Sequence, residues 1–178
     1  MIPIRLTLSG FLSYRDPVEI DFTSFDLACI SGANGAGKSS LLDAITWVLF
    51  GQARKRDDSL VNLQSGAAEV SLVFSYENNT YRVLRARPRG KTGVLEFHIQ
   101  QTNGSWKPLT ERTQVDTQAR IQETLRLDYD TFINAAFFLQ GKADQFTTET
   151  PTRRKQMLSS ILGLELWEEY RQRAADRR

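Results

Sequence analysis

The sequence predicts an α/β fold, built on a mixed sheet with an antiparallel β-subdomain and flanking helices. The first observation is an apolar run at residues 27–30, followed by a glycine-rich loop and an apolar helix over residues 39–50. The second is alternation of apolar and polar residues between 69 and 109, interrupted by turn residues. The third is a composition of 40% hydrophobic and 25% charged residues in a chain of 178. That composition is typical of a globular domain with a full core.

Three strands are expected in the first part of the chain, at residues 4–10, 18–22 and 27–31. In the first of them apolar and polar residues alternate, as in a half-buried strand. The third is uniformly apolar, which is typical of a central strand covered on both faces. We therefore expect Cys29, which lies in this third strand, to be a core residue.

The helix that follows, over residues 39–50, is apolar nearly all round, and such a helix is buried. Gly51 is placed to end it. Antiparallel strands come next, because turn residues separate alternating segments. They are expected at residues 69–76, 80–87, 94–102 and 106–109, with turns at 77–79 and 103–104.

Helical patterning returns at residues 116–125 and 129–139. A further helix is expected to begin at Thr150 and Pro151, an N-cap and first-turn proline, and to run to residue 162, where Gly163 ends it. Residues 164–178 are charged and helix-favouring, with no capping signal at the end. We expect a lobe over residues 1–163 and a further helix over 164–178 that belongs to a longer protein.

Composition excludes several classes of protein. A single cysteine cannot form a disulfide framework. No apolar run approaches the length that spans a membrane, and the first residues lack the apolar centre of a signal peptide. We therefore expect a cytoplasmic protein without a membrane partner. A net charge of +2 is too small to argue for nucleic acid by itself.

Residues 32–39, GANGAGKS, carry the chemistry of the chain. Glycines at these spacings let backbone N–H groups close round phosphates, and the positive end of the following helix points to the same place. Lys38 is expected to reach the β- and γ-phosphates of ATP, and the Ser39 hydroxyl to hold Mg²⁺. The alternative is a glycine-rich turn without a ligand, which the strand and helix on either side argue against. The expected nucleotide contacts of the loop are Asn34, Gly35, Ala36, Gly37, Lys38, Ser39 and Ser40.

A nucleotide hydrolase of this kind also needs a carboxylate on magnesium, usually an aspartate that ends an apolar strand. The sequence has no such strand after the loop. Asp57 and Asp58 lie in a basic stretch, and Asp128 and Asp130 in a polar one. We therefore expect the chain to hold half of an active site and to be nearly inactive on its own.

Several segments together resemble the amino-terminal lobe of ABC-type ATPases of the structural-maintenance-of-chromosomes superfamily, and most of all the SbcC/Rad branch that repairs DNA double-strand breaks. The resemblance rests on GANGAGKSSLLDAI at 32–45, GFLSY at 10–14 with VEIDF at 18–22, LFG at 49–51, NAAFFLQGKADQF at 134–146 and the helix at 150–162. The segment at 134–146 resembles the glutamine loop of that branch, and the last helix resembles the one that leads into its coiled coil.

The resemblance implies roles for further residues and for partners. Gln140 is implied to ligate magnesium and to sense the γ-phosphate and the attacking water. Ser13 and Arg54 are implied to border the nucleotide, while Leu12 stands where the family often has a basic residue. The carboxylates and the signature segment are implied to come from a carboxy-terminal lobe. Two heads would enclose two ATP molecules, with an SbcD-type nuclease at the base of the coil and double-stranded DNA across the heads.

Basic residues also cluster in the predicted strands. Arg85, Arg87 and Arg89 share one face of an extended strand and form a strip that suits a DNA backbone. The alternative is a solvated face or a charged sheet edge. Three other functions remain open besides DNA-end processing: a chromosome-organising ATPase head of the same superfamily, the nucleotide-binding domain of a transporter, and a nucleotide-binding module without turnover.

Overall fold

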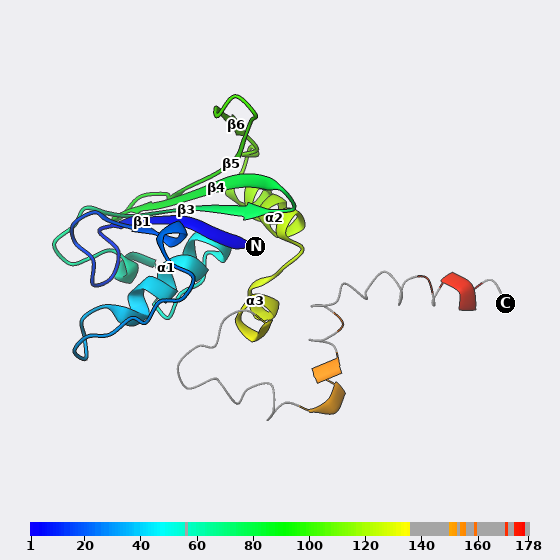
Figure 1. Ribbon diagram of the computed structural model, residues 1–178, viewed down its shortest axis with the longest axis horizontal. Coiled ribbons are helices and arrows are strands. Elements are labelled where there is room, and N and C mark those ends of the chain that lie inside the picture. Colours follow the sequence, from blue (N-terminus) through cyan, green and yellow to red (C-terminus); the bar gives the residue numbers. More distant parts are fainter. Residues whose placement is uncertain are drawn as a thin grey trace. The chain divides into compact units, whose positions relative to one another are not determined.

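The computed structural model describes residues 1–55, 57–135, 150–152, 154–155, 159, 170 and 173–176 (Figure 1). The chain divides into two units, Met1–Leu125 and Arg126–Arg178. The first unit contains the sheet, two helices and the glycine-rich loop. The second contains the helix α3 (Tyr129–Ala135), whose first turn is capped because the Asp128 carboxylate accepts the Thr131 N–H at 2.7 Å.

The sheet has six strands in the order β2-β1-β3-β4-β5-β6, and every neighbouring pair is antiparallel. Consecutive strands from β3 onward are neighbours, as in a meander. The strands are β1 (Ile2–Ser9), β2 (Val18–Asp21), β3 (Ala67–Tyr76), β4 (Asn79–Pro88), β5 (Val94–Gln100) and β6 (Trp106–Pro108). The α/β fold class is confirmed, but the described sheet is antiparallel throughout rather than mixed.

One face of the sheet forms the core. Leu6, Leu72, Val83 and Phe97 lie opposite one another across four strands, and each is fully buried. They line up because alternation sends every second side chain to the same face. Tyr81 continues this core, since its ring stacks between Phe74 and Phe97 at centroid distances of 5.7 and 5.6 Å.

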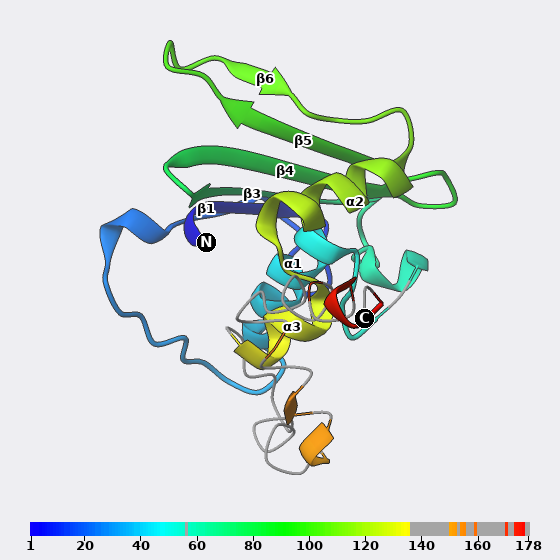
Figure 2. The same ribbon diagram turned by 90° about the vertical axis from the view of Figure 1, so that its right-hand side faces the viewer.

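Two helices cover this face (Figure 1, Figure 2). Helix α1 (Lys38–Phe50) contacts β3 and β4, and α2 (Gln114–Leu125) contacts β5 and α1. Helix α1 ends where the sequence predicts, because Gly51 has φ 71° and its N–H donates to the Trp47 carbonyl at 2.8 Å. Two short 3₁₀ helices, η1 (Phe22–Ser24) and η2 (Asp57–Leu60), lie in the connections.

The predicted central strand at residues 27–31 is wrong. This segment has no regular structure, Leu27 is 92% exposed and Ile30 50% exposed (Figure 2). Cys29, predicted in the core, is exposed. A strand needs a hydrogen-bonded neighbour, and this segment has none within the part of the chain that the structure describes. Its apolar pattern is therefore that of a strand without a partner.

The other strands and helices of the first unit match their predicted positions. The turn between β3 and β4 places Glu77 and Asn78 at φ 47° and 63°, as a two-residue hairpin requires. Of the predicted helix at 150–162, the described residues are helical from Pro151, and the Arg154 N–H donates to the Thr150 carbonyl. Residues 136–149, with the glutamine loop and Gln140, lie outside the described residues, and so does most of 160–178. The division at residue 163 and the coiled coil stay predictions.

The described helices include none that is long and apolar enough to cross a bilayer.

Candidate functional site

The loop before α1 has the backbone that its glycines predict. Gly35 and Gly37 have φ 85° and 94°, in the left-handed region that side chains disfavour. Gly37 is the N-cap of α1, and its carbonyl accepts the Ser40 N–H at 2.9 Å. The first turn of the helix therefore directs its unpaired N–H groups and its positive dipole end toward the loop, which is the arrangement that favours a phosphate.

Lys38, the first residue of α1, lies against this loop. Its ammonium donates to the carbonyls of Gly32 and Ala33 at 2.7 and 2.8 Å. The cation is thus held over the same backbone whose N–H groups suit phosphate. Ser39 follows it, with its hydroxyl in the first turn of the helix.

Ser13 and Tyr14 form a wall beside the loop. A Cβ placed on Gly37 would meet the Ser13 Cβ at 3.1 Å and the Tyr14 ring at 3.2 Å, so only glycine fits here without movement. The Ser13 hydroxyl lies 3.3 Å from that of Ser40. Burial raises the pKa of Tyr14 above its ordinary value.

The segment that carries Ser13 is anchored by Leu60 and Asn62, at and just after the end of η2. Leu12, with φ 49°, donates its N–H to the Leu60 carbonyl at 2.8 Å and accepts the Asn62 amide at 2.7 Å through its own carbonyl. The backbone of Leu12 thus fixes the wall, whatever its side chain does.

Arg54 returns to the first turn of α1 from the loop that follows the helix. Its Nη2 donates to the Ser40 hydroxyl at 2.9 Å, and its Nε lies 2.6 Å from Oδ2 of Asp43. The Arg54 side chain is 51% exposed, whereas that of Asp43 is 8% exposed. Burial raises the pKa of Asp43 above its ordinary value, although the N–H and the guanidinium of Arg54 oppose this.

Ser13, Ser40 and Arg54 line one groove of about 940 Å³, together with Leu12, Arg15, Arg89 and several residues between 55 and 64. The structure therefore brings together the predicted nucleotide residues that come from three separate segments. Asn34, Gly35 and Ala36 lie exposed in the loop itself. Sequence reasoning missed Asp43, although a lone carboxylate in a helix that is apolar nearly all round is a signal for a buried ion pair.

For magnesium, the described residues offer the Ser39 hydroxyl at the start of α1, a donor type that suits this ion. They include no group of three or more His, Cys, Asp and Glu that would hold a metal ion by themselves. Gln140, the other predicted ligand, lies outside the described residues.

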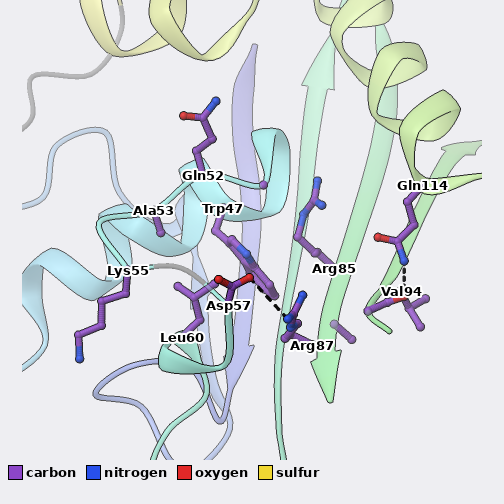
Figure 3. A pocket seen from close by; sticks show the side chains of 13 residues that line it. Trp47, Gln52, Ala53, Lys55, Asp57, Leu60, Arg85, Arg87, Val94 and Gln114 are labelled. Atoms are coloured by element: carbon purple, nitrogen blue, oxygen red, sulfur yellow. Dashed lines mark hydrogen bonds and ion pairs between the residues drawn. The ribbon is translucent and has the colours of Figure 1, made fainter. Parts of the chain in front are cut away.

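Arg85 and Arg87 lie on one face of β4, as the sequence predicts, but this face is the one that α1 covers (Figure 3). Arg85 donates through Nε to the Val48 carbonyl at 3.3 Å, and burial lowers its pKa to about 10. Arg87 donates through Nε to Asp58 at 3.2 Å and lies 3.7 Å from Asp57. Arg89, just beyond the strand, donates to the Asn62 carbonyl at 3.0 Å.

These arginines therefore contact the chain itself and hold α1, η2 and the following loop against the sheet. A DNA contact by Arg85, Arg87 or Arg89 stays an untested prediction, and the contacts described here are those of a structural role.

The comparisons with known proteins agree with this site. The AAA domain family matches residues 5–175. The chain is 32% identical to the SbcC subunit of the nuclease SbcCD from Deinococcus radiodurans over 99% of this chain and 20% of that protein. It is 34% identical to the DNA double-strand break repair Rad50 ATPase of Halobacterium salinarum over 98% of this chain and 19% of that protein.

The chain thus spans about one fifth of the length of these relatives. Among solved structures, the fold is similar to that of the recombination mediator protein RecF with ATP, at a TM-score of 0.51 and 17% identity over 89% of this chain and 37% of that chain. The chain belongs to the AAA domain family, as an ATPase head lobe of the SbcC/Rad50 type in the structural-maintenance-of-chromosomes superfamily.

Proposed function

We propose that this chain is the ATP-binding half of a DNA-repair ATPase that dimerises on ATP, hydrolyses ATP together with a carboxy-terminal lobe, binds DNA ends and gates a partner nuclease. The observation that carries the proposal is the loop at residues 32–37, with the Lys38 ammonium held over it and the Ser13, Ser40 and Arg54 groove beside it. This combination suits a nucleoside triphosphate better than a single phosphate.

Within this site, Lys38 pairs with the β- and γ-phosphates, and the first N–H groups of α1 donate to the phosphate oxygens. Ser39 and Gln140 hold Mg²⁺, which neutralises charge on the phosphates when bound. Ser13 and Arg54 border the nucleotide, since both line the groove beside the first turn of α1.

The proposal gives the carboxy-terminal lobe two tasks. It supplies the carboxylates that bind magnesium and orient water, because the described residues contain no acidic cluster of the required kind. It also covers residues 25–30, where Phe25, Leu27 and Ile30 are exposed apolar side chains and the described residues offer no strand partner. A neighbouring strand from that lobe would complete the sheet that the sequence pattern predicts.

The nuclease and the DNA enter through the relatives. Two bacterial relatives are named as the SbcC subunit of a nuclease SbcCD, and others are named for the repair of DNA double-strand breaks. We extend these roles to this chain: closure of two heads around ATP exposes DNA ends to the nuclease, and hydrolysis reopens them. A chromosome-organising head is the alternative, and it would lack the nuclease.

Steady-state ATP hydrolysis tests the proposal, measured for the chain alone and joined in one protein to its carboxy-terminal lobe, with and without linear duplex DNA. We expect turnover in the joined protein only, stimulated by DNA and lost in Lys38→Ala. Full turnover by the chain alone would contradict the split site. Turnover that linear DNA and the nuclease leave unchanged would favour the chromosome-organising alternative.

A further inference from the structure

Asp43 is the one charged side chain that is buried among the described residues. It lies on α1 three residues after Ser40, hence on the same face of the helix. A buried carboxylate is costly unless it is paired and hydrogen-bonded. The position of this charge in an otherwise apolar helix therefore calls for a function.

The contacts of Asp43 come from one residue, Arg54. The backbone N–H of Arg54 donates to Oδ1 at 3.2 Å. Its Nε lies 2.6 Å from Oδ2, an ion pair whose N–H is not aligned well enough to count as a hydrogen bond. The carboxylate thus holds both the main chain and the side chain of a residue eleven positions away in the sequence.

The other edge of the guanidinium is held as well, because Nη2 donates to the Ser40 hydroxyl at 2.9 Å, which in turn lies 3.3 Å from the Ser13 hydroxyl. A guanidinium is a rigid plane, so contacts on two of its edges fix its orientation. What remains accessible of Arg54 faces the groove that Ser13 and Ser40 line.

We propose that Asp43 is a positioning residue of the nucleotide site, which holds the Arg54 guanidinium against the first turn of α1 so that it meets bound ATP. The proposal rests on the proposed ATP site. Asp43 itself does not touch the nucleotide, since it is buried beneath Arg54. Its contribution to ATP binding passes through Arg54 alone.

A double-mutant cycle on ATP affinity tests this, with Asp43→Asn, Arg54→Ala and the pair measured in the 178-residue chain with Mg²⁺. We expect about tenfold weaker binding for each single variant and no further loss for the pair, because both remove the same charge-assisted contact. Unfolding midpoints without ATP give the structural cost separately. Additive losses would contradict a role through Arg54, and so would unchanged affinity of a folded Asp43→Asn variant.

Arg54→Lys tests the same point if Asp43→Asn does not fold. Lysine keeps the charge but cannot bridge Asp43 and Ser40 with a planar fork. We expect its affinity for ATP to be as weak as that of Arg54→Ala, and wild-type affinity would overturn the positioning role. Asp58→Asn is the matched control, since Asp58 pairs with Arg87 instead, and its ATP affinity should stay unchanged. Lys38→Ala separates the two proposals: if it binds ATP like the wild type, the ATP site itself is wrong, whereas a loss in Lys38→Ala alone contradicts only the role of Asp43.

Discussion

Arg85 donates a hydrogen bond through Nε to the carbonyl of Val48, in the last turn of α1. Gln118, which accepts from the same guanidinium, donates to the next carbonyl, that of Leu49, at 2.8 Å. The carbonyl end of a helix carries partial negative charge, so a buried cation here is compensated by the helix itself. The helix that begins at the phosphate loop is thus fastened at its other end to β4 and α2.

We therefore expect Arg85→Ala to lower the free energy of unfolding by about 2 kcal/mol, the typical cost of losing hydrogen bonds from a charged group. Chemical denaturation measures this. Arg112→Ala is the control, because Arg112 is an exposed arginine and its loss should change stability little. Equal, small effects of the two substitutions would show that Arg85 is not part of the helix cap.

Gly37→Ala is expected to abolish ATP binding. The new Cβ would meet Ser13 and Tyr14 at 3.1 and 3.2 Å, in a backbone at φ 94° that alanine disfavours. Gly104→Ala carries similar strain at φ 83° in the β5–β6 turn, where a Cβ meets nothing within 4 Å. It should therefore lower the unfolding midpoint slightly and leave ATP affinity unchanged. If both variants bind ATP normally, the contact between the wall and the loop is not required for the site.

His98 is the only histidine of the chain, which makes its titration easy to isolate. It faces Arg82 across β4 and β5, and its pKa is lowered from 6.5 by burial and by Arg82, against an opposing effect of Glu96. A lowered pKa in the folded state means that the unfolded chain binds the proton more readily. This contribution to stability is complete above the unfolded-state pKa of 6.5 and is lost as pH falls through the lower, folded-state pKa.

The unfolding midpoint should therefore fall when the pH is lowered from about 7.5 to about 5.5, and His98→Gln should reduce that slope. Thermal unfolding at several pH values measures it. An identical slope in the variant would assign the pH dependence to other groups.

Cys29 reports on the exposed apolar segment. As the single cysteine, and an exposed one, it should react with a thiol reagent at the rate of a free thiol in the chain alone. When the carboxy-terminal lobe is present, we expect the reaction to slow by at least about tenfold, because a strand that pairs with residues 27–31 would bury it. Unchanged reactivity would contradict the proposed cover.

The sequence was informative wherever the structure follows from local pattern. Leu6, Leu72 and Phe97 alternate with polar neighbours, and this alternation alone assigns them to a buried face. The phosphate loop was found because its glycines and Lys38 lie at fixed spacings within eight residues.

The errors arose where structure depends on distant partners. Residues 27–31 have the composition of a central strand, yet a strand forms only beside another strand. For Arg85 and Arg87, periodicity established that they share a face but not that α1 covers it. The pair of Asp43 and Arg54 joins a helix to the loop after it, and no local pattern gives that contact.

The most direct test of the central claim is the equilibrium affinity of the chain for ATP with Mg²⁺, measured beside Lys38→Ala and Lys91→Ala. Both are exposed lysines, but Lys38 lies over the phosphate loop and Lys91 in the turn after β4. We predict saturable binding by the wild type and by Lys91→Ala, and a loss of at least about a hundredfold in Lys38→Ala. Equal affinity of all three proteins, or no binding by any, would contradict the assignment of this loop as the ATP site.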